Sequence, residues 1–106
     1  MSEVLLVLTN LPDRGTAERI AEALVTARVA ACVNILPGCI SMYRWQGKLE
    51  RVDEVPLLIK TTRDAYDGLE KSLRALHPYE LPEIVAIAVT AGLPSYMEWV
   101  AQETRE

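Results

Sequence analysis

The sequence has no phenylalanine, one histidine and two cysteines among its 106 residues, and these shortages exclude several classes of protein. Two cysteines are too few for a disulfide scaffold, so Cys32 and Cys39 are expected to be free thiols in a reducing compartment. The sequence also lacks a Gly-rich phosphate loop and a paired-carboxylate hydrolase motif, and its single histidine leaves no sign of a Ser–His–Asp set. We therefore predict a protein that is not an enzyme.

Long apolar runs and clustered basic residues are missing as well. No run approaches the roughly 20 apolar residues that span a bilayer. The apolar stretch within residues 3–8 follows no basic segment and does not resemble a signal peptide. The formal net charge is −4 and the lysines and arginines are dispersed, which argues against a general nucleic-acid binder. These absences predict a cytoplasmic protein without membrane or nucleic-acid partners.

Half of the residues are hydrophobic, which is enough for one core in a single domain over residues 1–106. Apolar runs predict strands at residues 4–8, 55–59 and 84–89, with residues 9–13 as the exit loop of the first strand. Helical periodicity predicts amphipathic helices at 17–28, 66–76 and 96–100, with Thr16, Asp64 and Ser95 as their N-caps. The resulting order is an α+β, ferredoxin-like split βαβ fold (βαββαβ plus a C-terminal helix), with helices on one face of a four-stranded antiparallel sheet.

Residues 32–61 predict a long bent hairpin. A turn centred on Gly47-Lys48 sets Cys39 opposite Pro56, and prolines 37 and 56 at similar heights should bend the ribbon. Each arm has roughly 14 residues, or about 45 Å of strand, whereas a domain of this length has a radius of gyration near ~13 Å. The ribbon and the uncovered face of the sheet therefore predict a homo-oligomer.

Three places carry candidate binding residues. His77 begins a loop stiffened by prolines 78 and 82, with Tyr79 and Glu83 nearby; it is either a ligand or proton-transfer group, or a residue that caps the preceding helix. Tyr43 and Trp45 share one ribbon face and either pack against another subunit or line a small-molecule cleft. Lys60 either reaches solvent or meets a carboxylate such as Glu83.

The two cysteines do not complete a metal site on sequence grounds. Six residues separate Cys32 from Cys39, which is longer than the spacing of zinc or redox motifs. Cys32 is expected to be a small core residue, because it follows Ala30-Ala31 and free cysteines are commonly buried. A complete tetrahedral site from one chain is therefore not predicted.

Several motifs together resemble the CutA family, the divalent-cation tolerance proteins. They occur in the order of that family and run from the Leu11-Pro12-Asp13 loop to Trp99, nearly the whole chain. They are Ala31-Cys32-Val33-Asn34, Tyr43-x-Trp45-x-Gly47-Lys48-Leu49, Glu54 through Lys60-Thr61, His77-Pro78-Tyr79 with Pro82-Glu83, and Tyr96-x-x-Trp99.

The resemblance implies a ferredoxin-like trimer whose hairpins pair with neighbouring subunits, close in architecture to the PII-type signalling trimers. It implies a role in tolerance of copper and other divalent metals, with a copper ion or another divalent cation as the possible ligand. Copper-binding bacterial members carry a cysteine and a second histidine where this chain has Thr9 and Leu76. That departure leaves His77 as the matching metal ligand.

Two functional hypotheses follow. The first is a non-enzymatic trimer in metal-ion tolerance that binds a cation or effector in an inter-subunit cleft. Its candidate lining is Tyr43, Trp45, Lys60, His77, Tyr79 and Glu83. The alternative is a PII-like signalling protein that binds a small anionic metabolite, although no Gly-rich phosphate cradle is visible.

Overall fold

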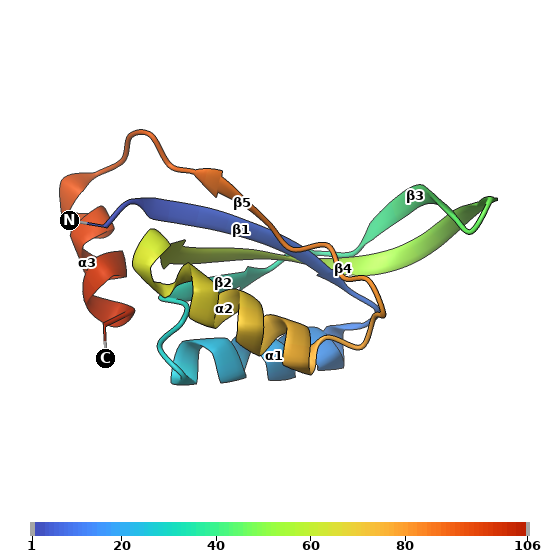
Figure 1. Ribbon diagram of the computed structural model, residues 1–106, viewed down its shortest axis with the longest axis horizontal. Helices are drawn as coiled ribbons and strands as arrows, with labels where there is room; N and C mark the ends of the chain where they lie inside the picture. Colours follow the sequence, from blue (N-terminus) through green and yellow to red (C-terminus); the bar gives the residue numbers. More distant parts are fainter. Residues whose placement is uncertain (1, 106) are drawn as a thin grey trace.

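Five strands and three helices make up residues 2–105, the part of the chain that this computed structural model describes (Figure 1). Their order agrees with the split βαβ pattern, with the first hairpin arm divided into two strands. In chain order they are β1 (Val4–Leu11), α1 (Arg14–Thr26), β2 (Cys32–Ile35), β3 (Cys39–Trp45), β4 (Lys48–Thr62), α2 (Arg63–Leu76), β5 (Val85–Ala88) and α3 (Pro94–Glu103).

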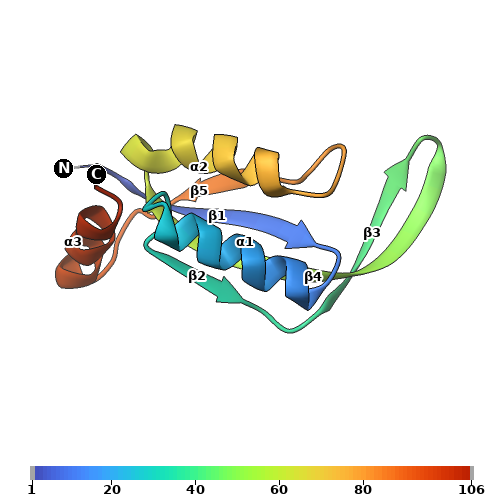
Figure 2. The same ribbon diagram turned by 90° about the horizontal axis from the view of Figure 1, so that it is seen from below.

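The main sheet has the order β2-β4-β1-β5 with antiparallel neighbours, and β3 continues alongside the outer part of β4. Helices α1 and α2 cover one face of this sheet, and α3 packs at the end where the chain termini lie (Figures 1 and 2). The predicted α+β ferredoxin-like fold, with a four-stranded antiparallel sheet and a long bent hairpin, is confirmed. None of the helices within residues 2–105 is long and apolar enough to cross a lipid bilayer.

The core lies between the helices and the sheet because alternate strand residues point toward the helices. Val7 and Leu11 of β1 and Leu57 and Ile59 of β4 have no exposed surface there. Leu24 of α1 fills the other side of the same cluster. Full burial of each such aliphatic side chain contributes about 1.5–3 kcal/mol, so this layer holds the sheet to the helices.

Strand β1 is longer than the predicted 4–8. Thr9, Asn10 and Leu11 were expected to form an exit loop, but they continue the strand and pair with β4, where Asn10 lies opposite Pro56. The extension comes from the partner strand, because β4 is 15 residues long and offers hydrogen-bonding groups well past Leu8. The three additional strand residues bring Asn10 to the root of the hairpin.

The predicted helix caps are wrong at all three starts. Asp13, in extended backbone, caps α1 by accepting the Thr16 backbone N–H at 2.8 Å, and this hydrogen bond lowers the pKa of the Asp13 carboxyl. Thr62 rather than Asp64 caps α2. The expected Ser95 capping box does not form, because proline already occupies the first turn of α3 and no side chain caps it. An N-cap must have extended backbone just before the first turn, and the ends of β1 and β4 set where that point falls for α1 and α2.

The hairpin turn lies one residue earlier than predicted. Gln46 has φ 50° and Gly47 has φ 81°, the left-handed pair that a two-residue hairpin turn of type I′ requires. The centre is therefore Gln46-Gly47 and not Gly47-Lys48. As a consequence Cys39 pairs with Glu54, two positions before its expected partner.

The ribbon bends where the two prolines meet, as predicted. The first arm is interrupted between Ile35 and Cys39, and there the Leu36 N–H donates to the Pro56 carbonyl at 3.0 Å. Pro37 has no amide hydrogen to continue the ladder. Beyond this break β3 and β4 curve away from the helical layers (Figure 2). The longest extent of the chain is 44 Å, which agrees with the length expected of the ribbon.

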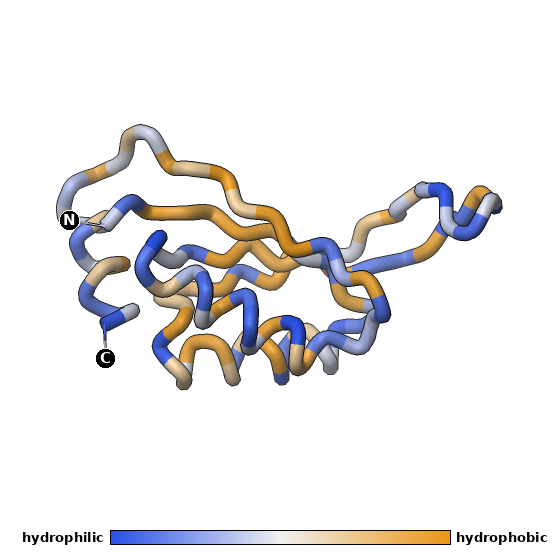
Figure 3. The backbone as a smooth tube through the Cα atoms, in the orientation of Figure 1, coloured by the Kyte–Doolittle hydropathy of each residue, from blue (hydrophilic) through white to orange (hydrophobic). Residues whose placement is uncertain are grey.

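The sheet face opposite α1 and α2 carries an apolar patch that this chain leaves largely uncovered. Register places Leu6 opposite Ile87, and Leu8 opposite both Val85 and Leu58, all on that face. Val85 is 46% exposed and Ile87 is 52% exposed. Figure 3 shows the hydrophobic colour continuing along β1 and β5. These five residues are called the open-face patch below.

Candidate functional site

The bend folds one face of the ribbon over the loop that follows α2. Strand alternation puts Ser41, Tyr43 and Trp45 of β3 on that face, together with Val52 and Glu54 of β4. The prediction that the two aromatic rings share a ribbon face therefore agrees with the strand register. The opposite ribbon face carries the strongly exposed Ile40, Met42 and Leu49.

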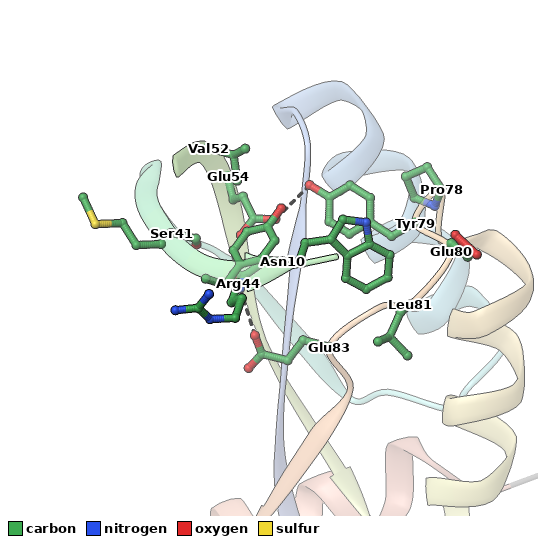
Figure 4. A pocket seen from close by; sticks show the side chains of 13 residues that line it. Asn10, Ser41, Arg44, Val52, Glu54, Pro78, Tyr79, Glu80, Leu81 and Glu83 are labelled. Carbon is green, nitrogen blue, oxygen red and sulfur yellow. Dashed lines mark hydrogen bonds between the residues drawn. The ribbon is translucent and has the colours of Figure 1, made fainter. Parts of the chain in front are cut away.

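A cavity of about 830 Å³ lies between this ribbon face and the loop (Figure 4). Its walls come from β1, both strands of the ribbon and residues 78–83. Of the six candidate residues from the sequence, Tyr43, Trp45, Tyr79 and Glu83 line it. The full lining is Asn10, Ser41, Met42, Tyr43, Arg44, Trp45, Val52, Glu54, Pro78, Tyr79, Glu80, Leu81 and Glu83.

His77 supports the cavity from behind. Its side chain is buried, and its ring centroid lies 4.9 Å from that of Tyr79. Nε2 donates to the Asn10 carbonyl at 2.9 Å, while Nδ1 accepts the Tyr79 backbone N–H at 3.2 Å. These two bonds fit the neutral imidazole with its proton on Nε2. The side chain thus links β1 to the loop, and the expected capping of the helix carbonyls falls to its backbone N–H, which bonds Leu73.

Burial lowers the pKa of His77 from its ordinary value of 6.5, and this outweighs the opposing effects of the Asn10 carbonyl and the nearby Glu54. The folded state therefore favours the neutral ring, and its contribution to stability is present above pH 6.5 and lost as the pH falls. Because the chain has one histidine, a single imidazole C–H resonance reports this group. We expect its NMR titration midpoint below 6.5 in the folded protein and near 6.5 in urea; a folded midpoint above 6.5 contradicts the geometry.

Tyr79 and Glu54 form the polar centre of the cavity. The Tyr79 hydroxyl donates to Glu54 Oε2 at 2.8 Å, and Glu54 is only 6% exposed (Figure 4). Burial raises the pKa of the Tyr79 hydroxyl well above its ordinary value, and the bond to Glu54 raises it further. Tyr79 therefore remains a hydrogen-bond donor at any physiological pH.

Glu83 is held by a residue that the sequence did not single out. Asn10 Nδ2 donates to Glu83 Oε1 at 3.1 Å across the base of the cavity. The backbone carbonyl of the same asparagine holds His77. A polar residue that interrupts an apolar strand was the signal available in the sequence, but residues 9–13 had been assigned to a loop.

Lys60 lies elsewhere. It pairs with Cys32 across β2 and with Leu6 across β1, and its ammonium contacts Asn34 Oδ1 and Cys32 Sγ. The alternative in which it meets Glu83 is wrong. Lys60 is six residues along β4 from Glu54, so the rise of the strand carries it away from the ribbon root.

Cys32 is half-buried and not a core residue as expected. Its neighbour Val33 takes the core-facing position, while Cys32 shares the open side of the sheet with Lys60. Cys39 is also a free, half-buried thiol, 3.8 Å from the Ser41 hydroxyl. The two cysteines lie on either side of the ribbon bend and form no shared site.

No group of three His, Cys, Asp or Glu side chains within residues 2–105 is arranged to hold a metal ion. Both ring nitrogens of His77 already have hydrogen-bond partners. Thr9 is buried, with no described partner for its hydroxyl, and Leu76 is 47% exposed at the end of α2. Metal binding by His77 stays a prediction, and it would require these hydrogen bonds to be exchanged.

Several residues that line the cavity were not among the site residues predicted from the sequence. Glu54 was noted for the resemblance but not for the site, because its burial depends on the pairing of β3 with β4. The other lining residues that were not predicted as site residues are Asn10, Ser41, Met42, Arg44, Val52, Pro78, Glu80 and Leu81.

Comparison with known proteins gives a consistent result. The family model described as "CutA1 divalent ion tolerance protein" matches residues 5–103. A divalent-cation tolerance protein CutA from Thermus thermophilus is 46% identical over 104 residues, covering 98% of this chain and 99% of that protein. The crystal structure of CutA from Xylella fastidiosa superposes with a TM-score of 0.95 at 47% identity, covering 98% and 100% of the two chains.

A more distant solved relative bears on cellular location. The periplasmic divalent cation tolerance protein CutA from Archaeoglobus fulgidus has a TM-score of 0.93 at 30% identity. The superposition covers 96% of this chain and 99% of that one. At least one protein of this fold and sequence pattern is therefore described as periplasmic.

Proposed function

We propose that this chain, which belongs to the family of CutA1 divalent ion tolerance proteins, acts in tolerance of divalent metal ions by binding an effector in the cavity between its ribbon and the 77–83 loop. The observation that carries the proposal is the convergence of Tyr43, Trp45, Tyr79 and Glu83 on one cavity. These residues come from two segments more than 30 positions apart. A loop that is only solvated does not require aromatic and acidic side chains from a distant strand to line one cavity with it. Copper is the metal for which the role is proposed.

A homotrimer is the proposed form of the protein. Support comes from the open-face patch, because apolar side chains that are about half exposed in one chain gain most by packing against copies of that chain. The ribbon projects beyond the helical layers and would bring the cavity close to a neighbouring subunit. A cytoplasmic location remains a prediction from the sequence.

A non-enzymatic role agrees with the chemistry of the cavity. Three of its titratable groups are engaged in structural hydrogen bonds, because Tyr79 donates to Glu54 and Asn10 donates to Glu83. The alternative, a signalling protein that binds an anionic metabolite, is disfavoured by three carboxylates against one guanidinium in the lining. The arrangement of the cavity therefore favours ligand binding over catalysis.

Deletion of the gene in its own organism is expected to lower the copper concentration at which growth is halved. The wild-type gene should restore tolerance, and so should Glu18→Gln, which alters an exposed residue of α1 that does not line the cavity. Tyr79→Phe should restore it less well, because the buried Glu54 loses its described donor. Unchanged growth of the deletion strain across copper, zinc and cobalt would remove the metal-tolerance role.

A further inference from the structure

The walls of the cavity present aromatic faces. Tyr43 and Trp45 line it from the ribbon, and Tyr79 lines it from the loop together with Pro78 and Leu81. Aromatic faces carry partial negative charge and attract cations, most strongly those whose charge is diffuse and weakly hydrated. Such walls favour a cation with an organic surface.

The polar groups of the cavity add formal negative charge. Glu54, Glu80 and Glu83 line it, and the one basic residue is Arg44, whose guanidinium Figure 4 shows turned away from Tyr79. By strand alternation Arg44 belongs to the opposite face of the ribbon. The lining therefore holds three carboxylates against one guanidinium, which is a formal excess of negative charge.

Glu54 is the most informative of these carboxylates. Its side chain is only 6% exposed. The hydrogen-bond partner found for its carboxylate within residues 2–105 is the neutral Tyr79 hydroxyl, which donates to Oε2. The salt bridge found within residues 2–105 joins Arg63 to Glu3 at the far end of the sheet and does not involve Glu54. Burying a carboxylate without a counter-charge costs free energy, and a cation that enters the cavity can supply that counter-charge.

Size separates an organic cation from a bare metal ion. A volume of about 830 Å³ falls in the range of small-molecule sites, whereas a metal ion needs a tight cluster of donors. No such cluster of three titratable donors exists within residues 2–105. The cavity is thus too wide and too aromatic for direct coordination.

We propose that this cavity binds an organic ammonium cation, with its alkyl or aryl body between Trp45 and Tyr79 and its positive charge beside Glu54 and Glu83. The inference rests on the proposed function only in using the same cavity as the effector site. It names the chemical class of that effector as a substituted amine. An inorganic cation and an anionic metabolite are the competing outcomes of the test.

Calorimetric titration of the purified full chain tests this assignment with three ammonium probes: tetramethylammonium, choline and benzylamine. At least one should bind, and 3,3-dimethylbutan-1-ol, the uncharged carbon isostere of choline, should bind about tenfold more weakly than choline. Glu54→Gln keeps an acceptor for Tyr79 but removes the charge, so it should weaken ammonium binding by about tenfold. Glu18→Gln is the matched control and should not change it.

Fluorescence places the probe in the cavity. The chain has two tryptophans, and Trp99 lies on α3, so Trp99→Phe leaves Trp45 as the reporter. Saturation with a bound ammonium probe should shift Trp45 emission, with the same midpoint as the calorimetric titration. A calorimetric signal without this shift would place the probe elsewhere and overturn the assignment.

Three results contradict the proposal: no binding of any ammonium probe, equal binding of the neutral isostere, or unchanged binding in Glu54→Gln. Binding of succinate or copper(II) chloride with loss of the ammonium signal would assign the cavity to the competing class instead. The growth assay of metal tolerance does not depend on these titrations, so a failure of the ligand class is separable from a failure of the proposed function.

Discussion

Replacing Ile87 by glutamate is expected to reduce the solution mass threefold, from that of the proposed trimer to the 11.8 kDa of one chain. Ile87 is 52% exposed and faces Leu6 across the open-face patch, so a carboxylate there remains hydrated in a single chain. In a trimer the same carboxylate is buried in every subunit, where burial of an unpaired charge costs several kcal/mol. Assembly should therefore be lost while the fold is kept.

Sedimentation velocity at micromolar concentration measures this change, and circular dichroism checks that the variant is folded. Val25→Glu is the matched control, because Val25 is 42% exposed on α1, away from the open face. Its mass should equal that of the wild type. A wild-type protein that sediments as a monomer, or an Ile87→Glu variant with unchanged mass, would show that the open-face patch does not drive assembly.

Replacing Leu57 by alanine is expected to lower the free energy of unfolding by about 3 kcal/mol, because truncation leaves a cavity in a close-packed core. Leu57 has no exposed surface, and it lies at the centre of the cluster between β4 and the helices. It also lies three residues from Glu54 on the same strand, so the loss is felt at the root of the ribbon. Urea unfolding at a fixed protein concentration measures it, since oligomerisation makes stability concentration-dependent.

The same strand supplies the control for this substitution. Leu49 lies near the tip of the ribbon and is 76% exposed, so Leu49→Ala should change the free energy of unfolding by no more than about 0.5 kcal/mol. Equal effects at the two positions would mean that the ribbon tip is buried in the assembled protein. That outcome would extend the subunit contact from the open-face patch to the tip of the ribbon.

Local patterns carried much of this fold. The period of Ile20 and Leu24 predicted the inner face of α1, and both are buried. Gly47 marked the hairpin tip, although the turn centre lies one residue earlier because Gln46 also adopts a positive φ. Such signals succeed because a residue and its neighbours along the chain determine them. The caps of α1 and α2 were predicted wrongly because the end of each preceding strand is set by its partner strand.

The residues of the candidate site also divide into those that local sequence patterns predicted and those that they did not. Alternation along β3 placed Tyr43 and Trp45 on one face, and the prolines fixed the 77–83 loop. Lys60 was misplaced, because its position depends on how far β4 extends from the ribbon into the sheet. No local pattern could reveal that Asn10, at the end of a strand longer than expected, would hold both His77 and Glu83.

The sequence by itself determined the order of strands and helices, the long bent ribbon and the aromatic pair on it, because period and backbone preference act over a few neighbouring residues. Only the tertiary structure decided that Glu54 and Tyr79 meet, 25 positions apart, and that three carboxylates share a cavity with aromatic walls. That meeting depends jointly on the strand register, on the bend between Ile35 and Cys39 and on the packing of α2. Each is a property of segments distant in the chain.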